Sequence, residues 1–368
     1  MRILFWTRLF GAHIGGVEIV CKALIHALKD RGHEIMAVAV QGDNDPIGED
    51  ICEGIRVHRI SSHQALMAQD LKAIAAIRYR VSALKQSFAP DLVHVHCTDP
   101  GTYFHLNSRI LPFPPTLLTI HDELKDERIQ DYALLGQLIR HADAVTTVSE
   151  FMLQLLKKNA SYAADRMSLV YNGLPESDQR NSHRFSVPRL LCLGRLSREK
   201  GFDVALDAFA EIAIKHPDVK LIIAGDGPDR EGLMSKGLRL GLSNRVMFPG
   251  WIPPEEVSDL IGSATITLMP SRFNEPFGLV ALQAAQQGCP VIAARVGGLP
   301  EVIEEGISGL LVEPDNSGAL ADNVLRLLND PALAIRMGDK GRERANRLFS
   351  FETMVDGYER IYSELEQS

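Results

Sequence analysis

The sequence predicts an α/β protein made of two doubly wound domains. Short apolar segments with the length of buried strands alternate with amphipathic helical segments along the 368 residues. A polar, proline-containing stretch at 174–188 interrupts this alternation once, and the alternation then resumes. Alternating βα units imply a parallel sheet with helices on its faces. We therefore expect domains at residues 1–180 and 187–349, whose strand ends face a central cleft, where such folds bind ligands.

The first domain begins with a buried strand at residues 3–6 and a glycine-containing loop. An amphipathic helix follows at 17–32 and is ended by Gly32. Further short apolar runs, each broken by a loop or helix, predict strands at 33–40, 91–97, 115–122, 142–150 and 167–173.

The second domain repeats the pattern. A strand and loop at 189–201 lead into a helix at 202–216. Apolar runs then predict strands at 219–227, 245–250, 264–270, 290–295 and 309–314. The tail from Phe351 is predicted to be an amphipathic helix with Tyr358, Ile361 and Tyr362 on one side. Residues 350–368 can therefore pack back onto either domain, including the first.

Composition excludes several classes of protein. The net charge of −8 argues against general nucleic-acid binding, which needs a basic face, although a local basic pocket can still bind phosphate. The five cysteines show no CxxC pair and lie near apolar runs, which is typical of buried thiols in a reducing compartment. The first ten residues are too short for a secretion signal, and no apolar run is long enough to span a membrane. We expect a cytoplasmic protein.

One helical segment, 66–88, carries Lys72, Arg78, Arg80 and Lys85. A basic helix of this kind suits peripheral contact with the inner face of a membrane and a lipid-linked acceptor. A helix face that is merely solvated has the same composition.

Two loops could bind an anion. Gly15 and Gly16 open the first helix, where free N–H groups and the helix dipole favour negative charge. Their spacing does not match the GxGxxG dinucleotide fingerprint, and a tight turn explains them equally well. Arg195 and Lys200 follow the first strand of the second domain and could clamp a diphosphate, although a charged surface turn is the alternative.

The stretch "SRFNEPFGLVALQ" places Glu275 just before a helix start, with Phe277, Gly278 and Leu279 offering backbone N–H groups and Gln283 eight residues after the acid. Ser271, Arg272 and Asn274 crowd the same loop, which is more polarity than capping needs.

In the first domain, His121 and Asp122 end a strand. His94 and His96 share one face of another strand, and we interpret them as sheet-packing residues because no further ligand follows them at metal-binding spacing.

Taken together, these loops resemble the retaining glycosyltransferases of the GT-B fold usually called family 4, or glycosyltransferase group 1. The resemblance covers nearly the whole chain. It is carried by the order and spacing of "GGVE", "TIHD", "YNG", "GRLSREKG", "AGDGP", "FPGW", "SRFNEPFGLVALQAAQQGCPVIAARVGGLPEVI" and "GLLVEP".

The resemblance implies roles for particular residues. Gly15 and Gly16 match the glycines near the donor diphosphate, and Arg195 and Lys200 match the cations that hold its β-phosphate. Ile252 matches the position whose backbone meets the nucleotide base. Glu275 and His121 match the acid and the histidine that contact the transferred sugar. The backbone donors beside sugar and phosphate are matched by Phe277, Gly278 and Leu279.

The family's second motif glutamate, which binds the ribose, is replaced here by Gln283. Glutamine keeps one carbonyl acceptor but loses the charge. A charge-assisted hydrogen bond is about twice as strong as a neutral one. The resemblance therefore implies retained activity with a weaker grip on the nucleotide.

The implied function is transfer of a hexosyl group from a nucleotide-diphosphate sugar to a glycan, lipid-linked or small-molecule acceptor, in cell-surface polysaccharide biosynthesis. UDP-glucose is the favoured donor and GDP-mannose the alternative. No cofactor or metal is expected. A nucleotide-sugar epimerase and a non-catalytic nucleotide-binding subunit are rival readings, against which the complete "EPFGL" loop and the intact Glu275, Arg195, Lys200 and His121 argue.

Overall fold

The computed structural model describes residues 1–10, 15–41, 48–96, 98–108, 111–122, 126–130, 133–175 and 187–367. The chain divides into two compact units. The N-terminal unit comprises Met1–Gly173 together with Phe351–Ser368, and the C-terminal unit comprises Leu174–Ser350. Most of the linker expected at 174–188 lies outside the described residues.

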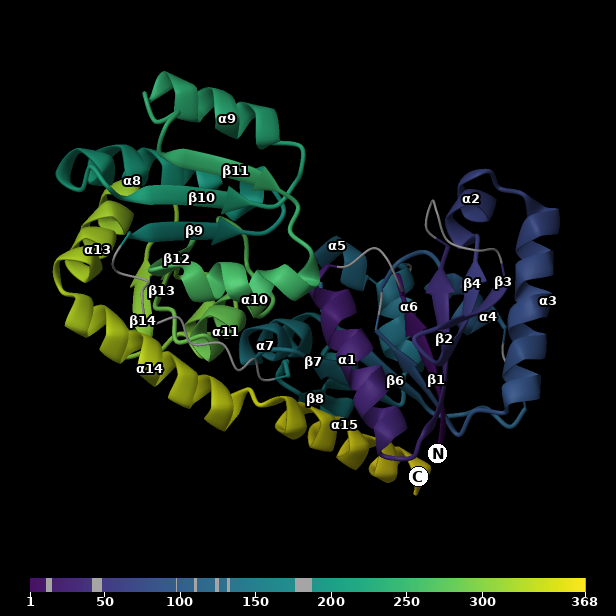
Figure 1. Ribbon diagram of the computed structural model, residues 1–368. Coiled ribbons are helices and arrows are strands. Elements are labelled where there is room, and N and C mark those ends of the chain that lie inside the picture. Colours follow the sequence, from purple (N-terminus) through teal and green to yellow (C-terminus); the bar gives the residue numbers. More distant parts are fainter. Residues whose placement is uncertain are drawn as a thin grey trace. The chain divides into compact units, whose positions relative to one another are not determined.

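The N-terminal unit is built on an eight-stranded sheet of order β3-β4-β2-β1-β5-β6-β7-β8 (Figure 1). Its strands are β1 (Arg2–Thr7), β2 (Glu34–Val40), β3 (Gly48–Cys52), β4 (Ile55–Ile60), β5 (Leu92–Val95), β6 (Thr116–Ile120), β7 (Ala144–Thr147) and β8 (Met167–Leu169).

The expectation of a wholly parallel sheet is wrong at one edge, because β3 pairs antiparallel with β4. Only Glu53 and Gly54 join the two strands, and both have positive φ, as a two-residue hairpin turn requires. A connection this short cannot join parallel strands.

The helices of this unit are α1 (Gly16–Asp30), α2 (Ser62–Met67), α3 (Leu71–Phe88), α4 (Thr102–Asn107), α5 (Asp126–Ile129), α6 (Leu134–His141), α7 (Glu150–Asn159), the 3-10 turn η1 (Ser161–Arg166) and α15 (Phe351–Glu366). The predicted C-terminal helix is α15, which lies beside α1 (Figure 1) and also contacts β5. Tyr358 and Tyr362 are fully buried in it, and Arg31 at the end of α1 forms ion pairs with three of its carboxylates.

The basic face predicted for 66–88 needs a correction. Lys72, Arg78 and Arg80 on α3 are exposed, but Lys85 is buried. The Lys85 ammonium donates a hydrogen bond to the carbonyl oxygen of His105 at 2.9 Å and lies 3.2 Å from His105 Nδ1. A buried ammonium needs such polar partners, so this lysine fastens α3 to α4 and is not presented to a surface.

The C-terminal unit has a fully parallel six-stranded sheet of order β11-β10-β9-β12-β13-β14. Its strands are β9 (Arg189–Leu193), β10 (Lys220–Ala224), β11 (Val246–Gly250), β12 (Ile266–Met269), β13 (Val291–Ala294) and β14 (Gly309–Val312). Its helical segments are η2 (Arg198–Lys200), α8 (Phe202–Lys215), α9 (Arg230–Arg239), α10 (Pro254–Ser263), α11 (Leu279–Gln286), α12 (Leu299–Val302), α13 (Ser317–Asn329) and α14 (Pro331–Leu348). Apolar side chains of α8 and α13 form its main core with one face of the sheet.

Each sheet has one switch point, where the strand order reverses. In the N-terminal unit it lies between β1 and β5, and in the C-terminal unit between β9 and β12. Loops that leave neighbouring strands in opposite directions open a crevice at such a point, and ligands of doubly wound folds bind there. Ligand-binding residues are therefore expected in the loops after β1, β5, β9 and β12.

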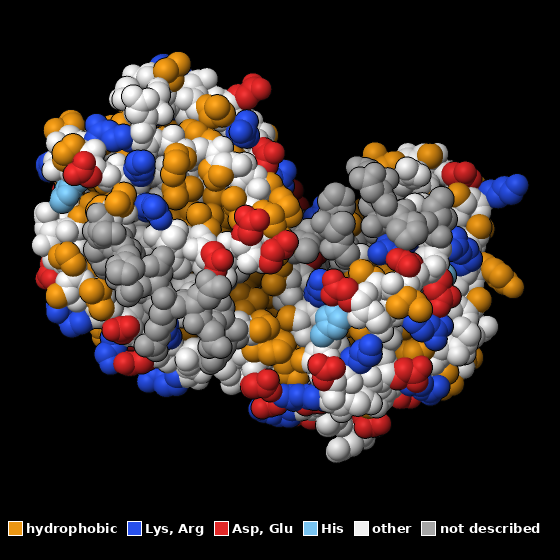
Figure 2. All heavy atoms as spheres, in the orientation of Figure 1, with side chains coloured by type: hydrophobic (Ala, Val, Ile, Leu, Met, Phe, Trp, Pro, Cys, Tyr) orange, Lys and Arg blue, Asp and Glu red, His pale blue; other side chains and the backbone are white. Residues whose placement is uncertain are grey.

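The surface and the cysteines agree with an ordinary globular chain. Within the described residues, no helix is long and apolar enough to cross a bilayer. On the face drawn in Figure 2, acidic and basic side chains are interspersed. Cys21, Cys192 and Cys289 are buried free thiols and Cys52 is half-buried, whereas Cys97 lies outside the described residues.

Candidate active site

The loops after β9 and β12 pack backbone against backbone at the switch point of the C-terminal unit. Gly201 makes this approach possible, because a Cβ atom there would lie 1.9 Å from the carbonyl oxygen of Pro270. Gly201 also has a φ of +68°, which glycine adopts without strain. The sequence order strand–loop–glycine thus places Lys200 directly beside the loop that carries Glu275.

Lys200, Ser271 and Glu275 form one hydrogen-bonded cluster. Glu275 is 6% exposed, and its Oε1 accepts from Lys200 Nζ at 2.6 Å and from Ser271 Oγ at 2.8 Å. The second carboxylate oxygen, Oε2, makes no hydrogen bond to any residue that the structure describes. A nearly buried acid with one unused oxygen at a sheet switch point is an acceptor available for a ligand hydroxyl.

Arg272 connects the loop after β12 with the loop after β9. Its guanidinium forms a two-pronged pair with Asp203 at 2.6 and 2.9 Å, and it also pairs with Asp315. It donates to the carbonyl oxygen of Arg198 at 3.0 Å, and its backbone N–H donates to Glu199 at 2.7 Å. Bidentate pairs of this kind fix orientation as well as adding energy. Arg272 thereby holds the loop that carries Lys200.

The N-terminus of α11 lies immediately after Glu275. Gly278 is its N-cap, with a φ of +106° and no side-chain cap. The backbone N–H groups of the first turn of a helix lack partners within the helix and carry partial positive charge. Phe277 is buried against Phe349, whereas Leu279 is half-buried. The backbone of Glu275 is held by Gly298, whose N–H donates to its carbonyl oxygen at 2.8 Å.

Three further predicted residues lie in the C-terminal unit, and the side chains of two of them are available to a ligand. Arg195 is exposed and Gln283 is half-buried, and neither side chain makes a hydrogen bond or ion pair within the described part of the chain. Gln283 lies one turn after Leu279 on α11, so both point to the same side of that helix. Ile252 is half-buried in the loop between β11 and α10.

In the N-terminal unit, Gly15 and Gly16 form the start of α1, after β1. Gly15 is the N-cap, and its N–H donates to Glu18 Oε2 at 3.0 Å, which is the half of a capping box that a glycine can form. A Cβ atom on Gly15 would lie 2.6 Å from that oxygen, which is the end of a flexible side chain and can move aside.

His121, at the end of β6, belongs to a row of three buried histidines. Its Nε2 lies 3.0 Å from His96 Nδ1, and His96 Nε2 lies 3.1 Å from His94 Nδ1. Burial lowers the pKa of His121 to about 4, and it lowers the pKa values of His94 and His96 well below the ordinary histidine range. All three imidazoles are therefore neutral at pH 7.

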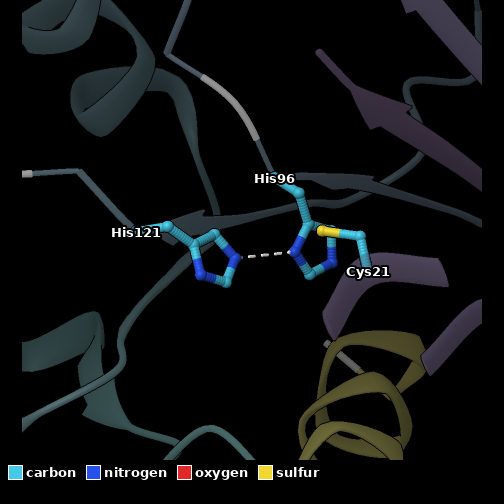
Figure 3. Close-up of side chains that lie close together, drawn as sticks. All are labelled: Cys21, His96 and His121. Atoms are coloured by element: carbon cyan, nitrogen blue, oxygen red, sulfur yellow. Dashed lines mark hydrogen bonds between the residues drawn. The ribbon is translucent and has the colours of Figure 1, made fainter. Parts of the chain in front are cut away.

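Cys21, on α1, approaches the same row, as Figure 3 shows. One ligand atom each from Cys21, His96 and His121 lie within 4.8 Å of one another, and this donor set is one that zinc accepts. Burial, however, raises the pKa of the Cys21 thiol, and both nitrogens of His96 are engaged by histidines. The cluster of Cys21, His96 and His121 is the candidate metal set that the described residues offer.

Sequence reasoning missed several of these residues. Ser271 and Arg272 were noticed only as loop polarity, and their partners lie on other loops. Cys21 and Tyr362 were expected only as buried residues, because their partners lie on strands that are distant in sequence. Gly201 lies against the backbone of Pro270. In the sequence it is visible only as a glycine that follows a charged loop, which does not reveal this contact.

Comparison with known proteins assigns both units. Residues 175–344 match the model of glycosyl transferases group 1, and residues 14–178 match that of glycosyltransferase family 4. The chain is a family 4 glycosyltransferase. Its fold is GT-B, as expected from the two Rossmann-like units, and it is a transferase enzyme of the hexosyltransferase type.

Relatives and solved structures agree with this assignment. Glycogen synthase of Mycobacterium tuberculosis is 26% identical over 95% of this glycosyltransferase and 91% of the relative. Sucrose-phosphate synthase from Thermosynechococcus elongatus superimposes with a TM-score of 0.84 at 23% identity, covering 99% of both chains. Anabaena HepE in complex with UDP-glucose gives a TM-score of 0.80 at 22% identity, covering 99% of this chain and 100% of that one.

Proposed function

We propose that this glycosyltransferase transfers a hexosyl group from a UDP-sugar, with UDP-glucose as the favoured donor, and retains the anomeric configuration. The observation that carries the proposal is the cluster of Lys200, Ser271 and Glu275 beside the N-terminus of α11. It combines a cation, an acid with an unused oxygen and a row of backbone N–H groups. A sugar diphosphate needs these three kinds of partner.

In this proposal the C-terminal unit binds the donor. Arg195, Lys200 and the first turn of α11, at Phe277–Leu279, stabilise the negative charge that develops on the leaving diphosphate. Glu275 Oε2 accepts a hydroxyl of the donor sugar, while Oε1 stays bound to Lys200 and Ser271. Gln283 binds the ribose, and the backbone at Ile252 meets the base.

The N-terminal unit contributes the start of α1 at Gly15 and Gly16 to the diphosphate, and His121 to the transferred sugar. We propose a front-face reaction in which the leaving phosphate helps to remove the acceptor proton. The two cations and the helix N-terminus take the place that a metal ion holds in other transferases, so no metal is required.

The proposed acceptor is a glycan, a lipid-linked saccharide or a small molecule, in cell-surface polysaccharide biosynthesis. GDP-mannose is the alternative donor. The exposed Lys72, Arg78 and Arg80 of α3 lie near the exposed apolar side chains of Leu71 and Tyr79, a composition that suits peripheral contact with an anionic membrane. Co-sedimentation with anionic vesicles tests this contact, and a variant with all three cations replaced by glutamine should lose it.

Calorimetry with a chelator present tests the donor. The protein is titrated with UDP, GDP, ADP and their sugar conjugates, and UDP-glucose is the first because the HepE structure with the same fold was solved with it. We expect metal-free binding of UDP and UDP-glucose that the Lys200→Ala variant weakens. Preference for GDP would select the mannosyl alternative. Absence of binding to every nucleotide would contradict the enzyme site, and product formation without acceptor would favour an epimerase.

A further inference from the structure

Arg272 lies in the loop between β12 and α11, and it holds the backbone of the turn η2. Its backbone N–H donates to the carbonyl oxygen of Glu199 at 2.7 Å, and its Nη1 donates to the carbonyl oxygen of Arg198 at 3.0 Å. These are the two residues that precede Lys200 in η2. Arg272 therefore fixes the backbone from which the Lys200 side chain leaves.

The ammonium of Lys200 is held by residues of the same loop. It lies over the ring of Phe273, 4.6 Å from the ring centroid, and it donates to Glu275 Oε1 at 2.6 Å. Both ends of this lysine thus depend on one loop, because Arg272 holds its backbone while Phe273 and Glu275 hold its ammonium. A long side chain loses much rotamer freedom when it is ordered, so it keeps one position only where several contacts hold it.

The guanidinium of Arg272 is oriented by two carboxylates. Asp203, in the first turn of α8, accepts from Nη1 at 2.6 Å and from Nη2 at 2.9 Å, and Asp315 in the loop after β14 accepts from Nε. Partial burial by itself would raise the pKa of the Asp203 carboxyl, but the bonds from Arg272 hold that pKa below its ordinary value, so Asp203 is charged at pH 7. Asp203 is the stronger partner, because its bidentate pair fixes geometry whereas the Asp315 side chain is 60% exposed.

These contacts leave the guanidinium little capacity to bind a ligand. Nη1 donates twice and Nη2 and Nε donate once each, so one N–H of the Arg272 guanidinium is left. Arg195 differs from it, because the Arg195 side chain makes no hydrogen bond or ion pair within the described part of the chain. Arg272 is therefore placed to hold other protein groups, and Arg195 to bind a ligand.

We propose that Arg272 and Asp203 are positioning residues for the diphosphate of the donor. They hold the loop after β9 against the loop after β12, and in this way they place the Lys200 ammonium where the β-phosphate binds. The proposal rests on the proposed role of Lys200 in binding that phosphate. Its consequence is selective: replacing either residue weakens ligands that carry a β-phosphate and spares ligands that lack one.

Calorimetry of the full chain with UDP and with UMP tests the proposal, because the two nucleotides differ only in the β-phosphate. We expect Arg272→Ala to weaken UDP binding about tenfold, the lower end of what a hydrogen bond to a charged group is worth, and to change UMP binding by less than about twofold. Arg272→Lys should recover part of the UDP affinity, because lysine keeps the charge but not the two-pronged pair. Asp203→Asn should also weaken UDP binding, whereas Asp315→Asn should leave it unchanged.

Arg245→Ala is the matched control. Arg245 precedes β11, at the opposite edge of the same sheet, and its Nη1 donates to the carbonyl oxygens of Ala213 at 2.6 Å and Pro217 at 3.3 Å. Its removal should lower stability without changing the ratio of UDP affinity to UMP affinity.

Two results of the calorimetry would overturn the proposal. The first is an Arg272→Ala variant that binds UDP normally or that loses UDP and UMP affinity equally. The second is stronger UDP binding by Asp203→Asn, because a guanidinium released from Asp203 would then be binding the phosphate itself.

Hydrogen exchange of the unliganded chain separates this proposal from the proposed function. Arg272→Ala should speed amide exchange at residues 197–201, where the Lys200 N–H donates to the carbonyl oxygen of Ser197 at 2.9 Å, and Arg245→Ala should not. If exchange responds in this way but the wild type binds no nucleotide, the proposed donor site is wrong and Arg272 still positions Lys200. If exchange in this loop does not respond, Arg272 does not position Lys200, whatever the wild type binds.

Discussion

At the scale of single residues, Lys200 and Glu275 form an ion pair in which only one carboxylate oxygen is used. The carboxylate is nearly buried and the ammonium is partly exposed, with side-chain exposures of 8% and 23%. Lys200 Nζ also lies over the ring of Phe273 at 4.6 Å, which limits its freedom. The cation is therefore already placed before a ligand arrives, and little reorganisation is needed when charge develops on a leaving group.

Replacing either predicted diphosphate cation should slow the chemical step strongly. We expect Arg195→Ala and Lys200→Ala each to lower kcat at least about a hundredfold, the usual effect of removing one strong electrostatic contact to a transition state. Initial rates with a UDP-sugar measure this. Arg198→Ala is the matched control, because Arg198 is exposed in the same loop, and it should keep its rate. Near-normal turnover in Arg195→Ala or Lys200→Ala would contradict the role of that residue.

Gln283→Glu tests the altered second position of the motif. The amide side chain has no partner among the described residues, so a glutamate can take its place without breaking a contact. A charge-assisted bond to the ribose should tighten nucleotide binding by about 1 kcal/mol, or about fivefold in Kd. Calorimetry with UDP measures the change. An affinity that neither Gln283→Glu nor Gln283→Ala alters would mean that this residue does not contact the ribose.

At the scale of elements, the site depends on how closely the loop after β9 approaches the end of β12. Gly201→Ala should displace that loop, because a Cβ there would meet the carbonyl oxygen of Pro270 at 1.9 Å, and backbone cannot give way cheaply. We expect a loss of stability greater than the 1–2 kcal/mol or so that a left-handed alanine costs by itself. Nucleotide affinity should fall as well, because Lys200 moves with the loop.

Comparison with Gly241→Ala separates the steric clash at Gly201 from the strain of a left-handed alanine. Gly241 has a φ of +71°, close to the +68° of Gly201, but a Cβ there would meet nothing within 4 Å. Denaturant unfolding and calorimetry of the two variants should therefore differ. Equal losses of stability, with nucleotide affinity kept in both, would show that the contact with Pro270 does not hold the loop.

The sequence predicted elements better than their partners. Strands and helices follow from period and punctuation, so the βα alternation and the C-terminal helix are found where expected. Lys85 was expected on a surface because its helix pattern is basic, yet the tertiary fold buries it against His105. The edge strand β3 was missed because GEDIC is polar and only half-buried. The contacts of Cys21 and Tyr362 depend on tertiary folding, which local pattern does not encode.

At the scale of the whole molecule, the row of buried histidines on β5 and after β6 contacts the C-terminal helix α15 within one unit. Burying these imidazoles lowers the free energy of unfolding of that unit in acid. Three neutral imidazoles are held away from water, where an unfolded chain would let each of them take up a proton below pH 6.5 or so.

This linkage predicts a loss of stability in mild acid. The folded pKa of His121, about 4, is below its unfolded value, so between these pH values the unfolded chain binds more protons and stability rises with pH. The contribution of these histidines to stability is fully present above pH 6.5 or so. It should fall on acidification by about 1.4 kcal/mol per pH unit for each histidine that stays neutral.

Denaturant unfolding between pH 7.5 and 5 or so measures the slope of stability against pH, with the fluorescence of buried Trp6 as the signal in a Trp251→Phe background. His121→Asn should reduce the slope by one such increment, whereas His63→Asn, which replaces an exposed histidine, should leave it unchanged. Equal slopes in the two variants would mean that His121 takes up a proton in the folded state as readily as in the unfolded one.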